Sequence, residues 1–250
     1  MKKILKRFYK RFVSPIIQIR PKNIGNYFTY RQHVISYQSL GGKIHSLWPI
    51  LGEDTATTSI DPHYFYQGIW AARHIIAAHP NRHIDIGSQV DLVGFLSTVM
   101  PVTFVDVRPL DVTVENLTSI KGNILNLPFT DSSVGSLSCL HVAEHIGLGR
   151  YGDPLDPQGT QKACRELSRV LAPGGKLYFS LPIGKERTEF NAHRVHTPKT
   201  ILSYFSNLKL VDFSAVDDRG HLIERADITA FDQARYACGL FLFTKEEKKS

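Results

Sequence analysis

Cysteine is scarce in this sequence, and long hydrophobic runs are missing. Only three of the 250 residues are cysteine, namely Cys139, Cys164 and Cys238, and no two of them form a CxxC pair. An odd number of widely spaced cysteines argues against a disulfide framework or a zinc ribbon and is typical of reduced thiols. No run reaches the ~18 apolar residues of a membrane-spanning helix, and no secretory-signal pattern follows the basic N-terminus. We therefore expect a cytoplasmic protein.

Acidic residues are absent from the first 52 positions, which contain ten lysines and arginines. The rest of the chain holds 20 lysines and arginines against 23 acids, so the formal net charge of +7 comes from the N-terminal segment. A basic groove for nucleic acid is therefore not expected in the main domain.

The most basic stretch, residues 1–19, has the pattern of an amphipathic helix. Ile4, Phe8 and Phe12 recur every four residues among lysines and arginines, and Pro15 should end or bend the helix. Two interpretations stay open. The helix lies on an anionic membrane surface, which would make the protein peripheral, or it packs against its own domain or a partner.

Beyond residue 60, segments with strand and helix patterns alternate. The expected strands cover 83–86, 102–107, 137–140 and 176–181, with weaker candidates at 208–216 and 240–243. The expected helices cover 61–78, 89–99, 156–172 and 197–205. This alternation predicts a parallel sheet with helices on both faces. We expect a basic, partly helical extension over residues 1–60, one α/β domain over 61–245 and a polar tail over 246–250.

Two of the expected strands end in an aspartate. Asp85 is followed by the turn residue Gly87, and Asp106 ends the next strand 21 residues later. A glycine turn at the carboxyl edge of a sheet lets the backbone approach a ligand closely. A carboxylate at the end of the following strand can accept hydrogen bonds from both ribose hydroxyls of a nucleoside cofactor. Two ordinary strand-end aspartates in turns are the alternative.

The next part of the chain carries an ordered series of motifs. It reads GNILNLPF over 122–129, HVAEH over 141–145 and RELSRVLAPGG over 165–175. With Asp85 and Asp106, this series resembles the class I S-adenosylmethionine-dependent methyltransferases of the small-molecule, ubiquinone-biosynthesis-like type. The resemblance implies a Rossmann-like, doubly wound α/β fold with a mostly parallel seven-stranded sheet. It also implies S-adenosylmethionine as cofactor and a small molecule or glycan as methyl acceptor.

A narrower resemblance rests on three other segments. They are DPHYFYQ over 61–67, HIGLGRYGDPLDP over 145–157 and FNAHRVH over 190–196. These segments resemble a methyltransferase-like domain family of unknown function, first named from nematode proteins and also found in bacteria.

The methyltransferase resemblance assigns cofactor contacts residue by residue. The expected positions are Asp85, Gly87, Ser88, Asp106, Val107, Asn123, Ile124 and His141. Two departures stand beside them, because Gln89 and Asp91 occupy the places of the second and third glycines of the usual motif. A side chain there loses easy access to positive φ and fills space beside a ligand. A methyltransferase-like module that binds without catalysis is therefore the main alternative.

Residues after the fourth and fifth expected strands should meet the acceptor. His145 or His193 is the expected base, Tyr151, Asp153, Asn191 and Arg194 are expected acceptor contacts, and Arg150, Lys185 and Arg187 offer positive charge for an anionic acceptor. His141, Glu144 and His145 also match H-x-x-E-H, the pattern of a zinc hydrolase. That chemistry needs both histidines on one helix face, whereas His141 follows a strand. No metal is therefore expected.

Overall fold

The computed structural model describes residues 24–247, so the amphipathic segment predicted over 1–19 lies outside the described residues. The chain forms two compact units, Met1–Ser59 and Ile60–Ser250. In the first unit, helix α3 (Ile24–Ser39) exposes most of its side chains and buries Tyr27. No helix within 24–247 is both long and apolar enough to cross a membrane.

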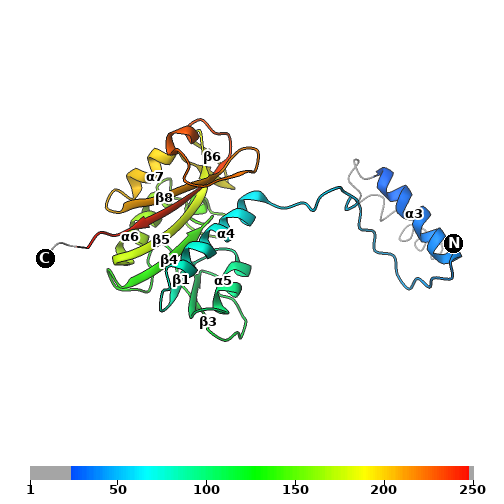
Figure 1. The fold of residues 1–250 in the computed structure, drawn as a ribbon, viewed down its shortest axis with the longest axis horizontal. Coiled ribbons are helices and arrows are strands. Elements are labelled where there is room, and N and C mark those ends of the chain that lie inside the picture. The colour runs from blue at the N-terminus through cyan, green and yellow to red at the C-terminus, as the bar shows by residue number, and fades with distance from the viewer. Residues whose placement is uncertain (1–23, 248–250) are drawn as a thin grey trace. The chain divides into compact units, whose positions relative to one another are not determined.

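The second unit is built on one large sheet (Figure 1). Its strands are β1 (His83–Ile86), β2 (Val102–Asp106), β3 (Leu117–Lys121), β4 (Val134–Leu140), β5 (Leu171–Ile183), β8 (Lys209–Val216), β9 (Leu222–Ile223) and β10 (Ala237–Thr244). They lie in the order β3-β2-β1-β4-β5-β10-β8-β9. The pairs from β3 to β5 are parallel, whereas β10 runs antiparallel to both β5 and β8. The carboxyl ends of β1, β2, β4 and β5 therefore meet at one edge.

Helices cover both faces of this sheet, as predicted. They are α4 (Pro62–Ala77), α5 (Val90–Ser97), α6 (Gly159–Val170) and α7 (Pro198–Tyr204). One buried cluster joins apolar residues of α6 and α7 to the sheet. A second cluster joins those of α4 and α5 to the other face. Neighbouring residues of β5 alternate between the two, with Phe179 in the first cluster and Tyr178 in the second, as expected from the period of a strand.

Local chemistry explains where the predicted helices begin and end. The Asp61 carboxylate accepts hydrogen bonds from the backbone N–H groups of His63 and Tyr64, and Pro62 occupies the first turn, so α4 starts as predicted. The helix predicted over 156–172 is shorter, because α6 ends at Val170 and the chain enters β5 directly. Gly174, at φ +71°, lies inside β5.

The structure differs from the predicted elements in three respects. The sheet has eight strands, not seven, because the two-residue strand β9 pairs with β8. A separate hairpin of β6 (Arg187–Glu189) and β7 (His193–Val195) was not predicted, nor was β3. The helix predicted over 89–99 is shorter in the structure, where α5 covers Val90–Ser97 and leaves Phe95 75% exposed.

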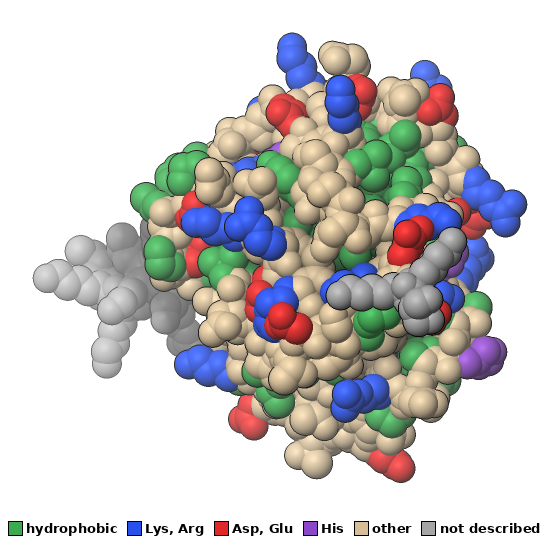
Figure 2. Space-filling model, turned by 90° about the vertical axis from the view of Figure 1, so that its left-hand side faces the viewer, with side chains coloured by type: hydrophobic (Ala, Val, Ile, Leu, Met, Phe, Trp, Pro, Cys, Tyr) green, Lys and Arg blue, Asp and Glu red, His purple; other side chains and the backbone are tan. Residues whose placement is uncertain are grey.

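Charge is dispersed on the face of the molecule drawn in Figure 2. Lysine and arginine side chains are interspersed there with acids and with apolar groups, and they do not gather into a stripe.

Candidate functional site

The site begins at the turn that follows β1. Gly87 has φ +64°, and a Cβ at this position would lie 3.2 Å from Asp106 Oδ2 and 3.4 Å from the methyl groups of Val142. Glycine therefore satisfies the backbone conformation and keeps the space beside the Asp106 carboxylate open.

Asp85 shapes this turn from beneath. Its buried carboxylate accepts the backbone N–H of Ser88 at 2.9 Å and the hydroxyl of Ser138. His83, also buried, bonds the hydroxyls of Ser136 and Ser138 at 2.8 Å each. Burial raises the pKa of Asp85 to about 6 and lowers the pKa of His83 to about 3. The pair forms a polar network between β1 and β4 that fixes the turn from within the protein.

A small hollow of about 100 Å³ opens above this turn. It is lined by Ile86, Gly87, Val105, Asp106, Val107, Arg108, Gly122, Ile124, His141, Val142, His145, Ile146 and Tyr151. Asp106 Oδ1 accepts the Arg108 N–H at 2.7 Å. The Arg108 guanidinium lies 4.7 Å from the centre of the Tyr151 ring, so these two side chains meet at the hollow. The result is an apolar recess with one carboxylate at its rim.

A larger hollow of about 750 Å³ lies beside the small one. Its lining comprises Asp61, Pro62, His63, Tyr64, His141, Glu144, His145, Arg150, Arg187, Glu189, His193, Asp217, Asp218, Arg219, Gly220, Arg235 and Tyr236. His141 and His145 line both hollows, so the two spaces meet at these histidines.

His141 follows β4 directly and is held on both ring nitrogens. Its Nδ1 lies 2.9 Å from Glu144 Oε1, and its Nε2 lies 3.3 Å from Cys238 Sγ. Burial opposes the charge on Glu144, but the adjacent His141 holds the pKa of this carboxyl below its usual range. Burial likewise opposes the charge on His141, but Cys238 and Glu144 raise its pKa well above the usual value. Glu144, His141 and Cys238 thus form a buried row of side chains in which each ionisable group affects the charge of its neighbour.

The two predicted bases differ in what they contact. His145 Nδ1 donates to the Ala192 carbonyl at 2.6 Å, and its Nε2 faces Glu144 Oε1 at 3.6 Å. His193 Nε2 is buried and has no hydrogen-bond partner within residues 24–247, although Glu189 Oε2 is 3.5 Å away. Burial lowers the pKa of His193, so its imidazole is neutral at pH 7.

Many of the predicted site residues come together at the hollows. Gly87, Asp106, Val107, Ile124, His141 and Tyr151 line the small hollow, His145 lines both, and His193 lines the large one. Tyr151, predicted as an acceptor contact, thus lines the small hollow together with several predicted cofactor contacts. Arg150 and Arg187 also line the large hollow.

Other predicted contacts line neither hollow and have local structural partners instead. Asp85 and Ser88 hold the turn, where the Ser88 hydroxyl accepts the Leu140 N–H. Asn123 Oδ1 accepts the Leu125 N–H, and Asp153 Oδ2 accepts the Gly147 N–H.

The last two predicted acceptor contacts also lie outside the hollows. Arg194 is buried and donates to the carbonyls of Ile146 and Asp156. Asn191 is exposed between β6 and β7.

Part of the large hollow comes from distant segments that the sequence did not mark as a site. His63 and Tyr64 come from the first turn of α4, Asp217 to Gly220 follow β8, and Tyr236 precedes β10. The segment over 61–67 carries a family resemblance but no pattern of a site. The residues after β8 carry no local pattern of a site either. They lie at the large hollow because β8 is next to β10 in the sheet.

The zinc-hydrolase pattern H-x-x-E-H does not form its usual arrangement. Residues Ala143–His145 form a single 3-10 turn, and His141 precedes it. Both His141 Nδ1 and His145 Nε2 face the same oxygen of Glu144, at 2.9 and 3.6 Å. The histidines therefore bracket the carboxylate and do not converge on a metal in front of it.

The sheet order, the Gly87 turn and the aspartate at the end of β2 define a Rossmann-like fold of the class I methyltransferase type. A family model described as "Caenorhabditis protein of unknown function, DUF268" matches residues 130–229. No relative was found among the curated proteins.

Solved structures share this fold at low sequence identity. The chain is similar to the N-methyltransferase NodS from Bradyrhizobium japonicum WM9 in complex with S-adenosyl-L-homocysteine (TM-score 0.53, 16% identity, 85% of this chain and 99% of that chain). It is similar to a putative sarcosine dimethylglycine methyltransferase from Galdieria sulphuraria (0.52, 13%, 73% and 86%). It is also similar to the [4+2]-cyclase SpnF (0.56, 13%, 86% and 93%). These likenesses establish the fold, and a cyclase among them means that the reaction must be argued from the site.

Proposed function

We propose that this protein is an S-adenosylmethionine-dependent methyltransferase that acts on a small-molecule or glycan acceptor. The observation that carries the proposal is the meeting of the two hollows at His141 and His145. A methyl transfer needs donor and acceptor in adjoining spaces, aligned and shielded from water.

The small hollow suits the adenosine end of the cofactor. Asp106 lies beside Gly87, where it can accept hydrogen bonds from ribose hydroxyls, and Val107 and Ile124 offer apolar surface for a base. When bound, the cofactor supplies an activated methyl carbon, and the protein mainly positions the acceptor.

The two missing glycines do not block this site. Gln89 has φ −61°, which any residue adopts, so glycine is not required at this position. Both Gln89 and Asp91 are exposed, and neither lines the small hollow. The departures from the usual motif therefore leave the ribose end of the hollow intact.

One observation favours the non-catalytic alternative. The small hollow, at about 100 Å³, is well below the ~300–1,000 Å³ of a usual ligand pocket. Arg108 and Tyr151 meet across it, so a whole cofactor requires these side chains to move apart or must extend beyond them. A module whose hollow stays closed would bind a partner through the larger hollow without catalysis.

The larger hollow suits a polar, hydroxyl-rich acceptor. Four arginines and five carboxylates line it together with Tyr64 and Tyr236. Arginines and carboxylates can bind hydroxyl groups as donors and acceptors, and tyrosine rings can pack against a sugar ring. His193 is the better base of the two predicted histidines, because it lines the large hollow and its Nε2 has no hydrogen-bond partner among the described residues.

Calorimetry of the full chain with S-adenosylmethionine and S-adenosylhomocysteine tests the proposal directly. Binding of either supports a methyltransferase, whereas a folded protein that binds neither supports the non-catalytic module. A screen of sugars and nucleotide sugars, read as S-adenosylhomocysteine formed, then identifies the acceptor. With that acceptor, His193→Gln should lose roughly 100-fold or more in turnover and keep cofactor affinity.

His196→Gln is the matched control for that variant. His196 lies three residues away, also has a buried Nε2 without a hydrogen-bond partner in the described chain, and lines neither hollow. Equal losses in both variants would assign His193 a structural role.

We also propose that residues 1–19 bind an anionic membrane surface as a helix. This proposal rests on their basic, amphipathic sequence pattern.

A further inference from the structure

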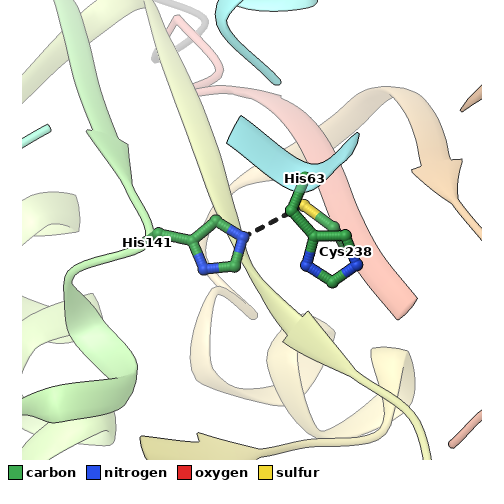
Figure 3. Close-up of side chains that lie close together, drawn as sticks. All are labelled: His63, His141 and Cys238. Carbon is green, nitrogen blue, oxygen red and sulfur yellow. Dashed lines mark hydrogen bonds between the residues drawn. The ribbon is translucent and has the colours of Figure 1, made fainter. Parts of the chain in front are cut away.

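Three side chains from distant parts of the chain converge between the two hollows. His63 comes from the first turn of α4, His141 from the end of β4 and Cys238 from β10, as Figure 3 shows. One ligand atom of each lies within 4.8 Å of the other two. His141 Nε2 and Cys238 Sγ are only 3.3 Å apart. Two imidazole nitrogens and a thiol sulfur thus lie close together.

The surroundings orient both histidines. His141 turns Nε2 toward the sulfur while its Nδ1 is held by the buried carboxylate of Glu144 at 2.9 Å. The His63 ring stacks on the Tyr236 ring, with the ring centres 5.1 Å apart. Metal-binding histidines almost always donate their other ring N–H to a carboxylate or a backbone carbonyl. His141 meets this condition through Glu144.

We propose that His63, His141 and Cys238 bind Zn²⁺. Imidazole nitrogen and thiolate sulfur are donors that zinc prefers, and three protein ligands leave one of its four tetrahedral positions open. Both histidines line the large hollow, whereas Cys238 is buried beneath them, so the open position faces that hollow. The metal replaces the proton between His141 and Cys238.

Charge balance is compatible with zinc in place of the proton that His141 shares with its neighbours. Glu144 is fully buried, and one of its oxygens, Oε2, has no hydrogen-bond partner in the described chain. A buried carboxylate is costly unless a positive charge compensates it. A zinc ion with one thiolate ligand carries a net charge of +1, which the carboxylate of Glu144 offsets through His141.

A nucleophilic cysteine is a less suitable interpretation of the same residues. Cys238 is fully buried and lines neither hollow, so its sulfur cannot reach a molecule bound there. The proposed site also differs from the H-x-x-E-H zinc pattern, because Glu144 orients a ligand and His145 is bonded to the Ala192 carbonyl. The proposed zinc site does not depend on whether the protein binds S-adenosylmethionine.

Cobalt substitution of the chelator-treated, full-length protein tests the site. Added Co²⁺ should give a thiolate-to-cobalt charge-transfer absorption. Zn²⁺ should displace the cobalt and bind with one equivalent per chain. Cys238→Ser should abolish that absorption. Glu144→Gln should weaken zinc binding roughly 10–100-fold, as changes to residues that orient a ligand do. His63→Gln, which removes a ligand itself, should weaken zinc binding more than this.

Cys164→Ala is the matched control, because Cys164 is equally buried but belongs to the core on the other face of the sheet. It should bind cobalt with an unchanged spectrum. The proposal is overturned if the folded wild-type protein binds no zinc, if Cys238→Ser keeps the charge-transfer absorption, or if His63→Gln binds zinc normally. His63 is only partly buried, so its variant should fold and test the site even if Cys238→Ser does not fold.

Discussion

At the scale of single residues, the rim of the small hollow is the simplest place to test cofactor binding. Asp106→Ala should weaken S-adenosylmethionine binding by ~1.5–3 kcal/mol, because it removes a charged acceptor for the ribose hydroxyls. Isothermal calorimetry measures this loss. Asp111→Ala, at an exposed position on the loop after β2, is the control and should bind normally. A folded Asp106→Ala protein with unchanged affinity would remove the ribose role from this residue.

The buried pair of Asp85 and His83 predicts two opposing effects of pH on stability. The folded-state pKa of Asp85, about 6, exceeds the ordinary value of 3.8, so its contribution to stability is present below pH 3.8 and is lost as pH rises to about 6. The folded-state pKa of His83, about 3, is below the ordinary 6.5, so its contribution is present above pH 6.5 and is lost as pH falls toward 3. Between pH 4 and 6 the two slopes, each about 1.4 kcal/mol per pH unit, oppose each other.

Single variants should separate these slopes. Asp85→Asn leaves the contribution of His83, so the free energy of unfolding should rise more steeply from pH 4 to 6 than in the wild-type protein. His83→Gln leaves the contribution of Asp85, so the free energy of unfolding should fall over the same range. Urea denaturation at several pH values measures both. Identical pH slopes in the two variants would contradict the opposed pair.

At the scale of elements, β7 anchors the loop that leads from η3 (Ala143–His145) to α6. Arg194 on β7 donates to the carbonyls of Ile146 and Asp156, at 2.6 and 2.9 Å, and thereby joins the two ends of this loop. Arg194→Lys keeps the charge but loses the planar fork. We expect the free energy of unfolding to fall by ~1–3 kcal/mol, because buried carbonyls lose their donors.

Denaturant unfolding measures this change, and Arg165→Lys on the exposed side of α6 is the control. If the two variants are equally stable, Arg194 does not anchor the loop.

The residues of the site differ in how far the sequence alone could predict them. The places of Gly87 and Asp106 beside the small hollow were predictable, because a glycine or an acid that follows an apolar strand is a local pattern. Arg194 was expected to contact an acceptor, because nothing in its neighbours reveals the carbonyls that it meets across the fold. The strand β3 was missed since its burial alternates only weakly over Leu117–Lys121.

Long-range convergence was the least predictable feature. His63 and Cys238 are 175 positions apart, and they meet because β10 is inserted between β5 and β8 beside the start of α4. A single sequence records no such proximity. The spaces at the edge of the sheet could be anticipated from its predicted topology, whereas the side chains that fill them could not.

At the scale of the whole molecule, the N-terminal positive charge and the domain should act separately. Six lysines and arginines among the first 11 residues surround the apolar repeat of Ile4, Phe8 and Phe12, well before the first acid, Glu53. Each lysine or arginine near an anionic membrane contributes roughly 1 kcal/mol, and this attraction falls with salt. We therefore expect the full chain to bind anionic vesicles in low salt and to bind neutral vesicles much more weakly.

A chain shortened to begin at Pro21 should lose vesicle binding and keep its affinity for the cofactor, as measured by co-sedimentation and by calorimetry. The reason is that the residues lining the two hollows all lie after residue 60. Equal vesicle binding by both proteins would exclude the membrane role of residues 1–19. Unfolding or aggregation of the shortened chain would instead show that these residues pack against the rest of the protein, which is the alternative that their amphipathic pattern left open.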